Sequence, residues 1–429
     1  MNGIRVVLPQ KYDLVVGDTF QLFYRGVVEA PDPFCYDILA VCEKGKNFTR
    51  YFEFCPEEAG EYELTIYVYS ADKSLLGKGK TMLKVVKPEE PLKQLNILCM
   101  GDSLTVGGQW PQEAYRRLTA NDGEPKGLGF KNISFVGSCK KDDVCYEGYG
   151  GWKWESYMTK VTSARWVECK LDKTEEDQHS LWQDEQSNLW QMETIDQFGF
   201  IKFMRYGGHE ADMPQSGYLY HYKHAVHQEP ICIKKSFSGK PSPFYDAESE
   251  KIDFASYCKR NNIDRVDAVY VLLGWNGLHM AKCSLKEHCN TIVKNAKEVV
   301  DMIHNEFPDV KIRVMGLQIP SVNGGMGTNY GAVMPYCDDY GMARYVMDLN
   351  QAYEAWTQED GYCYFMEFIN ISGQFDTDYN LPCAEKKVNT RSNTTEIIGT
   401  NGAHPTYEGY MQIADAVFRN MVHLCKNRK

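Results

Sequence analysis

The part of the chain from about residue 93 onward alternates short apolar runs with longer amphipathic stretches, and this alternation most constrains its fold. The apolar runs predict strands at residues 97–100, 133–137, 268–273, 312–317 and 363–368. The amphipathic stretches predict helices at residues 111–119, 287–305, 339–358 and 406–425. Because strands that alternate with helices form parallel sheets with right-handed crossovers, this part predicts a three-layer α/β/α domain.

The first ninety residues follow a different pattern, in which polar and apolar residues alternate between turn-forming Gly, Pro and Asp. Residues 18–25 and 61–69 show the alternation, and residues 80–86 are the expected last strand. The pattern predicts an all-β domain at residues 1–90, built as a small immunoglobulin-like sandwich. Residues 87–93 contain two prolines, which favour extended backbone, so we expect a short linker before a second domain at residues 91–429.

A stretch of about a hundred residues, from about 155 to 264, interrupts the alternation and is interpreted as an insertion. It is rich in Trp and Tyr, so it is either a lid that selects substrates or a surface layer packed by its own aromatic side chains. Four histidines lie in it, at His209, His221, His224 and His227. Their spacing fits neither a zinc-binding helix nor a zinc ribbon, so neither a metal nor another cofactor is expected.

The first predicted strand of the α/β part ends on Gly101-Asp102-Ser103. Ligands of open α/β sheets bind beyond the carboxyl ends of the strands, which makes Ser103 a candidate nucleophile. Gly101 permits a tight turn there, and Asp102 is expected to stabilise that turn. The alternative is that Ser103 caps the following helix, since serine is a favoured N-cap.

Three further segments downstream contain candidate site residues. They are Glu147-Gly-Tyr-Gly-Gly-Trp152, Leu273-Gly-Trp-Asn-Gly277 and Asn401-Gly-Ala-His-Pro405. With Gly101-Asp102-Ser103 they resemble the four blocks of the GDSL/SGNH hydrolase family, which supply Ser, Gly, Asn and His in this order. Ser103, Gly151, Asn276 and His404 match these blocks one by one. The resemblance covers roughly residues 93–429 and implies a flavodoxin-like SGNH fold and the hydrolysis of carboxylic esters.

The resemblance also implies a role for each matching residue. Ser103 would attack the ester, and His404 would take its proton. The oxyanion donors would be the backbone N–H groups of Ser103 and Gly151 and the side-chain amide of Asn276. Alternatively Gly151 is a turn glycine, with Gly150 as the matching residue, and Asn276 is a turn or cap residue.

Two positions depart from the family pattern. Gly277 stands where the family often has Asp, and Asn401 stands where the family usually has the aspartate that orients the histidine. An amide oxygen can accept a hydrogen bond from the imidazole, but it cannot stabilise the imidazolium by charge. The chain is therefore expected to use a weaker Ser103–His404 dyad supported by Asn401 or to have lost activity. Glu408 is an alternative source of the acid.

The composition narrows the list of partners. A net charge of −11 and a pI near 5.5 argue against nucleic acid, and the absence of a long apolar run argues against a membrane. The first residues do not resemble a signal peptide, so the protein is expected in the cytoplasm, or outside the cell if a leader has been removed. Of the fifteen cysteines, Cys35 with Cys42 and Cys139 with Cys145 could form disulfides, and the others are expected as thiols.

These observations predict a two-domain serine esterase that removes acyl groups, acetyl groups foremost, from a carbohydrate or another small polar ester. The alternatives are a lipase or thioesterase of the same family, and a catalytically silent glycan-binding protein. The sequence does not indicate an oligomeric state.

Overall fold

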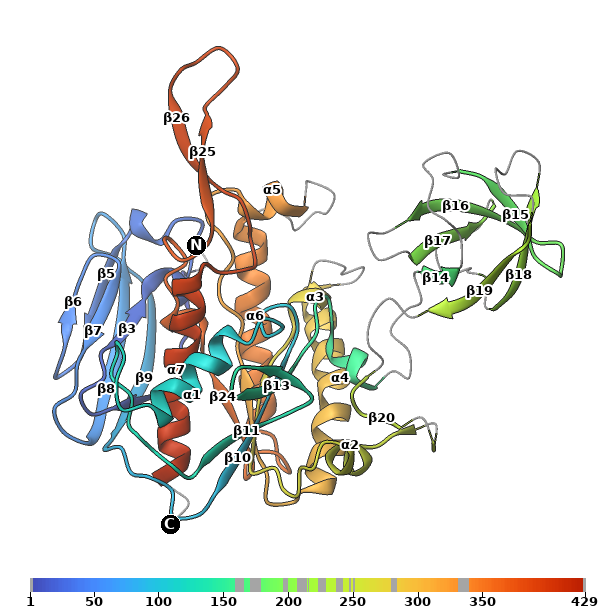
Figure 1. The fold of residues 1–429 in the computed structure, drawn as a ribbon. Coiled ribbons are helices and arrows are strands. Elements are labelled where there is room, and N and C mark those ends of the chain that lie inside the picture. Colours follow the sequence, from blue (N-terminus) through green and yellow to red (C-terminus); the bar gives the residue numbers. More distant parts are fainter. Residues whose placement is uncertain are drawn as a thin grey trace. The chain divides into compact units, whose positions relative to one another are not determined.

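The computed structural model describes residues 3–158, 166–169, 179–195, 200–206, 214, 216–222, 229–236, 242–246, 248–249, 251–278, 284–330 and 339–426. The chain is a mixed α/β protein that divides into two compact units. One unit is formed by residues 1–155 together with residues 258–429, and the other by residues 156–257. The first unit contains both the N-terminal β-domain and the α/β domain (Figure 1).

The α/β domain is built on a seven-stranded sheet. Its strands are β10 (Leu95–Gly101), β11 (Ile133–Val136), β12 (Cys139–Lys141), β13 (Val144–Gly148), β22 (Ala268–Leu272), β23 (Lys311–Met315) and β24 (Met366–Ile369). Strand β10 pairs in parallel with β11, β13 and β22, and the parallel pairing continues through β23 to β24. Every residue of β22 is buried, as expected for a strand covered on both faces.

Long helices pack against one another in pairs beside this sheet. They are α1 (Gln109–Thr119), α4 (Leu285–Glu306), α6 (Asp339–Thr357) and α7 (Tyr407–Lys426). Helix α1 packs on α7, and α4 packs on α6. All four lie close to their predicted ranges, because each carries an apolar face at helical spacing. The three-layer arrangement of the domain stays a prediction.

Shorter elements complete the α/β domain. They are α3 (Trp275–Leu278), α5 (Gly325–Tyr330), the 3-10 turn η5 (Ser372–Gln374), and the hairpin of β25 (Cys383–Lys387) and β26 (Thr395–Gly399). The 3-10 turn η3 (Trp154–Met158) and helix α2 (Phe254–Arg260) each cross a boundary between the two units. The sequence missed β12 and β13, and it placed the strand at residues 133–137 directly before Gly150 and Gly151. In the structure β13 leads into that segment, since β12 and β13 form an antiparallel hairpin after β11.

The N-terminal β-domain consists of two main sheets around one hydrophobic core. Their strands are β2 (Lys11–Val15), β9 (Leu75–Val86), β8 (Gly60–Tyr69) and β5 (Asp37–Val41) in one sheet, and β3 (Phe20–Phe23), β7 (Tyr51–Phe54) and β6 (Lys46–Asn47) in the other. Also present are the pair β1 (Arg5–Val6) and β4 (Val28–Glu29) and the 3-10 turns η1 (Tyr24–Gly26) and η2 (Pro33–Cys35). The immunoglobulin-like character of this domain stays a prediction.

The disulfides suggested by the sequence are not formed. Cys35, Cys42, Cys139 and Cys145 are all free thiols. Cys139 lies opposite Tyr146, and Cys145 lies opposite Lys140, in the β12–β13 hairpin. Because successive residues of a strand point to opposite faces, the side chains of Cys139 and Cys145 lie on opposite faces of the hairpin.

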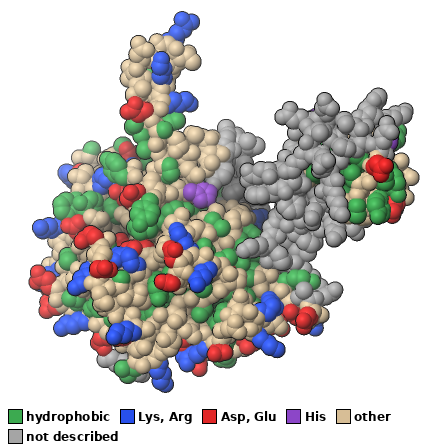
Figure 2. All heavy atoms as spheres, in the orientation of Figure 1, with side chains coloured by type: hydrophobic (Ala, Val, Ile, Leu, Met, Phe, Trp, Pro, Cys, Tyr) green, Lys and Arg blue, Asp and Glu red, His purple; other side chains and the backbone are tan. Residues whose placement is uncertain are grey.

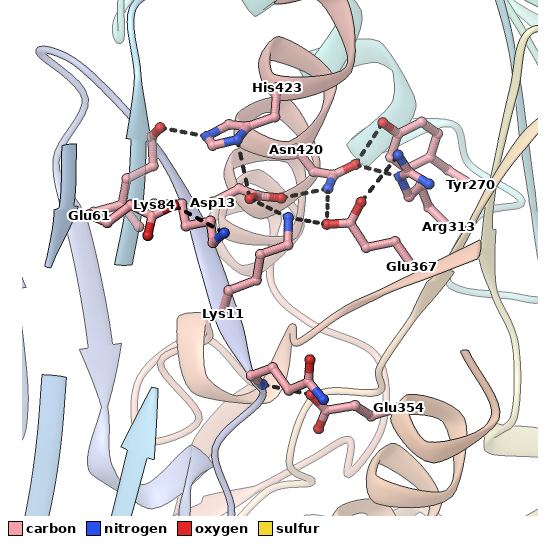
Figure 3. Close-up of polar contacts among 12 residues, drawn as sticks. Lys11, Asp13, Glu61, Lys84, Tyr270, Arg313, Glu354, Glu367, Asn420 and His423 are labelled. Carbon is pink, nitrogen blue, oxygen red and sulfur yellow. Dashed lines mark hydrogen bonds and ion pairs between the residues drawn. The ribbon is translucent and has the colours of Figure 1, made fainter. Parts of the chain in front are cut away.

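A polar junction joins the β-domain to the α/β domain (Figure 3). Asp13 on β2 accepts hydrogen bonds from Lys11 at 2.7 Å and from the Asn420 amide on α7 at 2.7 Å, and it lies 3.3 Å from the His423 ring. Lys11 also pairs with Glu367 on β24. Burial alone would raise the pKa of Asp13, but the neighbouring His423 and Lys11 outweigh it and lower this pKa.

Asp18, in the turn between β2 and β3, forms a second part of this junction. It pairs with Arg117 on α1 and with Arg419 on α7, whose Nε lies 2.5 Å from the carboxylate. Arg117 also donates to Asp415 on α7 at 2.5 Å. The junction therefore clamps the two helices that follow the Ser103 and His404 segments.

The second unit contains a closed barrel whose strands the sequence did not predict. The strands are β14 (Trp166–Cys169), β15 (Leu181–Gln183), β16 (Leu189–Ile195), β17 (Phe200–Arg205), β18 (Ser216–Tyr222) and β19 (Ile231–Ser236), followed by the small pair β20 (Tyr245–Asp246) and β21 (Lys251–Ile252). The barrel has its own core, in which Trp182, Trp190 and Phe203 are buried. The lid interpretation of this segment stays a prediction.

Candidate active site

Ser103 lies in a compact turn directly after β10. The N–H groups of Thr105 and Val106 donate to the carbonyl of Asp102 at 2.9 and 3.0 Å, and Gly108 donates to Thr105 at 2.8 Å. The N-cap of α1 is Gly108, with positive φ and no side-chain cap, so Ser103 does not cap this helix. Its hydroxyl is therefore available for another role.

His404 meets Ser103 across 301 positions of sequence. Its Nε2 atom lies 2.8 Å from the Ser103 Oγ atom. Partial burial lowers the pKa of His404 from its usual 6.5, so the ring is neutral at neutral pH. A neutral imidazole nitrogen at this distance can accept the hydroxyl proton, which is what a general base must do.

Asn401 supports the backbone of this segment more than it supports the His404 ring. Its Oδ1 atom accepts from the N–H groups of Ala403 at 3.0 Å and His404 at 2.9 Å, and it lies 3.3 Å from His404 Nδ1. Three donors share one oxygen, and the ring contact is the longest of them. In the described part of the chain no carboxylate bonds to Nδ1, and Glu408 is an exposed residue that interacts with Thr406 and its own backbone.

Asn276 lies at the start of α3, just after β22. Its Nδ2 atom donates to the Asp102 carboxylate at 3.0 Å and to the Trp152 carbonyl at 3.0 Å. One amide thus joins the Ser103, Gly151 and Asn276 segments. Because both of its N–H hydrogens have acceptors here, its action on an oxyanion needs one of these bonds to be released, and that role stays a prediction.

Asp102 is a fully buried carboxylate beside Ser103. Its Oδ1 atom accepts from the Leu104 N–H at 3.0 Å, which is the turn contact expected from the sequence. Burial raises the pKa of Asp102 to about 7, although hydrogen bonds from Leu104, its own backbone and Asn276 oppose the rise. No cation in the described part of the chain balances this group.

Gly151 lies in a turn with a φ of +78°, a conformation that favours glycine. A Cβ atom at Gly151 would meet nothing within 4 Å, so the backbone conformation and not crowding selects the glycine. This loop lies beside the Ser103 turn, because the N–H of Tyr149 donates to the Gly101 carbonyl at 3.2 Å. Gly150 also faces open space, so it remains the alternative donor.

Two buried side chains that the sequence did not single out hold these segments in place. The Gln318 amide donates to the Ala403 carbonyl at 2.6 Å and accepts from the Trp275 ring N–H at 3.4 Å, which links the His404 and Asn276 segments. Glu147 accepts from Ser138 and from the Tyr149 hydroxyl, and so fixes the start of the Gly151 loop. Gln318 follows β23 at the same carboxyl edge as Ser103, a signal that could have identified it.

The histidine cluster of the insertion can be described only in part. His209, His224 and His227 lie outside the described residues, and His221 is exposed on β18. Among the residues that the structure describes, no three His, Cys, Asp or Glu side chains are grouped as a metal site.

The charges on the surface and the apolar character of the helices are relevant to the expectations about nucleic-acid and membrane partners. Figure 2 shows acidic and basic side chains interspersed over the face of the first unit that is in view. No helix within the described ranges combines the length and the apolar character needed to span a bilayer.

Comparison with known proteins gives structural similarity only. No family model and no curated protein matches the chain. A carbohydrate esterase family 2 enzyme with a carbohydrate-binding domain from Corynascus thermopiles (Myceliophthora fergusii) is 8% identical, with a TM-score of 0.30 over 99% of this chain and 93% of that one. A family two carbohydrate esterase from Cellvibrio japonicus is 12% identical, with a TM-score of 0.26 over 99% and 96%. A peptidoglycan O-acetylesterase is 13% identical, with a TM-score of 0.29 over 78% and 92%. Sequence identities and TM-scores this low establish no family, so the function must follow from the geometry of the site.

Proposed function

We propose that this protein is a serine esterase that hydrolyses acyl esters of a carbohydrate or another small polar alcohol. The observation that carries the proposal is the 2.8 Å contact between Ser103 Oγ and His404 Nε2 at the carboxyl edge of a parallel sheet. A serine hydroxyl needs a neighbouring base to become a good nucleophile, and a neutral His404 is such a base.

The reaction proceeds in two halves. In the first, Ser103 Oγ attacks the ester carbonyl carbon while its proton moves to His404 Nε2. The tetrahedral intermediate then collapses, the bond to the alcohol oxygen breaks, and His404 returns the proton to the leaving alcohol. In the second half a water molecule attacks the acyl-enzyme with His404 again as base, which releases the carboxylic acid and restores Ser103.

The oxyanion that develops in each half needs donors. The backbone N–H groups of Ser103 and Gly151 belong to turns that lie side by side, because β10 and β13 are paired at Gly101 and Gly148. Asn276 would add a third donor after giving up its bond to Trp152 or to Asp102. Donors of this type are the largest single source of stabilisation in acyl transfer.

A second function, a catalytically silent glycan-binding protein, has one observation in its favour. His404 has an amide and not a carboxylate at Nδ1, so the imidazolium formed during attack is not stabilised by charge. The esterase proposal is favoured because the nucleophile and its base are nonetheless in hydrogen-bond contact.

The test is hydrolysis of p-nitrophenyl acetate by the wild type, Ser103→Ala and the control Ser392→Ala, whose partly exposed serine lies in the turn between β25 and β26 and accepts from the Thr394 N–H. Ser103→Ala is expected to abolish turnover and labelling by a fluorophosphonate probe, whereas Ser392→Ala keeps both. A wild type without turnover or labelling would favour the glycan-binding alternative, and turnover by Ser103→Ala would refute the nucleophile assignment.

A further inference from the structure

A cleft of about 420 Å³ lies between α1, the turn of the β12–β13 hairpin and the first two turns of α7. Its walls include Gln109 and Gln112 on α1, Lys141 and Asp143 at the hairpin turn, and Tyr407 on α7. Sites for small molecules commonly have volumes of about 300 to 1,000 Å³. The cleft is therefore large enough to hold a sugar-sized ligand.

Both helical walls of the cleft continue from the catalytic segments. Helix α1 begins at Gln109, directly after the compact turn that contains Ser103. Helix α7 begins at Tyr407, just after His404 and Pro405. The wall formed by the β12–β13 hairpin is close to the turn that contains Ser103 and ends at Gly108, since a Cβ atom on Gly108 would lie 3.3 Å from Lys141 Cδ. The end of the cleft at Gln109 and Tyr407 is therefore the end that follows the Ser103 and His404 segments in the chain, and from there the cleft runs along α1 to Thr119 and Ala120.

The side chains that line the cleft are suited to a ligand with many hydroxyl groups. Tyr407 is 68% exposed, so its ring offers a flat face with a polar tip. Among the described residues, the side chains of Gln109, Lys141, Asp143 and Tyr407 have no hydrogen-bond or ion-pair partner. They present donors and acceptors together, and a neutral polyol satisfies both kinds of group whereas an alkyl chain satisfies neither.

We propose that this cleft binds the alcohol part of the substrate ester, a sugar or short oligosaccharide, with Tyr407 as the residue on which a sugar ring stacks. The inference rests on the proposed function, since it assigns the place of the leaving group. Tyr407 determines specificity in this proposal and takes no part in the bond changes at Ser103.

The experiment compares two esters. Tyr407→Ala is assayed with a short O-acetylated xylooligosaccharide, whose alcohol fills the cleft, and with p-nitrophenyl acetate, whose alcohol is a small activated phenol. We expect the KM for the oligosaccharide to rise about tenfold, which corresponds to a loss of about 1.4 kcal/mol of binding free energy. The kcat/KM for p-nitrophenyl acetate should fall by a clearly smaller factor, because its single phenol ring fills little of the cleft.

Tyr364→Ala is the matched control. Tyr364 is also an exposed tyrosine, at 62%, but it precedes β24 and so lies at the amino edge of the sheet, opposite the site. This variant should retain the wild-type KM for both esters. Because Tyr364 and Tyr407 are both on the surface, neither substitution should prevent folding.

The outcomes separate this inference from the proposed function. If the wild type hydrolyses neither ester, the proposed function fails, and calorimetric binding of the deacetylated xylooligosaccharide to wild type and Tyr407→Ala tests the cleft alone. Equal losses on both esters would show that Tyr407 acts on the catalytic pair, and no loss on either would show that the cleft is unused. If p-nitrophenyl octanoate is assayed as a third ester, a loss confined to it would show that the cleft holds the acyl chain. Each of these three results overturns the proposal.

Discussion

The junction between the β-domain and the α/β domain and the turn around Ser103 both bury carboxylates, but they treat them in opposite ways. In the junction Asp18 lies between two arginines, Arg117 and Arg419. In the turn around Ser103 the donors to Asp102 among the described residues are neutral, and His404 faces an amide. The carboxylate charge in the junction is thus neutralised by arginines, whereas the turn around Ser103 has groups, Asp102 and His404, whose protonation changes near neutral pH.

The pKa values follow from this difference. Burial alone would raise the pKa of Asp18, but the charges of Arg419 and Arg117 outweigh burial and lower it. For Asp102 no such charge opposes burial, and the pKa rises to about 7. Similar burial therefore produces opposite shifts, and the partners decide the sign.

Removal of Asp18 should have the largest effect on stability. Asp18→Ala leaves Arg419 without its carboxylate and Arg117 with Asp415 alone, and breaking a buried pair in this way costs about 3 to 5 kcal/mol. The free energy of unfolding from urea titration measures it. The control is Asp37→Ala, which breaks the exposed pair with Lys73 and should cost less than about 1 kcal/mol. Equal costs would mean that the junction contributes no more than a surface ion pair.

The second prediction concerns the pH dependence of stability. The pKa of Asp102 is about 7 in the folded protein and 3.8 for an unburied aspartate, as in the unfolded chain, so the folded state binds this proton more tightly. Protonated Asp102 therefore adds to the free energy of unfolding. This addition is fully present below pH 3.8 and is lost as the pH rises to 7, at up to about 1.4 kcal/mol for each pH unit.

Asp102→Asn removes this titration. Relative to the wild type, the variant should gain stability as the pH rises from 4 to 7 and then show a constant difference, as measured by urea unfolding at each pH. The slope with pH is the diagnostic quantity, because the substitution also changes the contact with Asn276. Parallel curves for the two proteins would show that Asp102 is ionised throughout.

The third prediction concerns a substitution that gives His404 the negatively charged neighbour that it lacks. Asn401→Asp should raise kcat about tenfold, which corresponds to about 1.4 kcal/mol of added stabilisation of the imidazolium. A carboxylate at this place also raises the pKa of His404, so the rising limb of the pH–rate profile should move to higher pH. In the wild type, burial should keep that limb below pH 6.5.

Asn401→Ala completes the series, and it should lower kcat while KM changes little, because the ring contact matters most in the transition state. The measurement is kcat against pH for all three proteins with p-nitrophenyl acetate. Three superimposable profiles would make Asn401 a bystander for catalysis.

The smallest effect is expected at Gln318, a neutral positioning residue. Gln318→Met removes the hydrogen bonds to Ala403 and Trp275 at similar volume. A neutral hydrogen bond contributes about 0.5 to 1.5 kcal/mol, so kcat should fall about threefold to tenfold. Gln374→Met is the matched control, since Gln374 is also a buried amide but bonds to Asn370 and Arg419 away from His404. If both variants lose kcat equally, Gln318 has only a general structural role.

Local pattern in the sequence predicted the elements that carry the site. The apolar run at residues 97–100 led to β10, and the helical spacing at residues 406–425 led to α7. It predicted neither the β12–β13 hairpin nor the barrel strands. These strands have polar residues between their apolar ones, so they lack the continuous apolar run that identifies a buried strand.

The sequence by itself determined the types and order of the main elements of the α/β domain and the candidates Ser103, Gly151, Asn276 and His404. Periodicity and turn chemistry act over a few residues, so they can be seen in a single chain. Only the tertiary structure decided that Ser103 contacts His404, that both N–H groups of the Asn276 amide are already used, and that Asp18 clamps α1 to α7. Those contacts join residues far apart in sequence, and the packing of the sheet and helices is what brings them within hydrogen-bond distance.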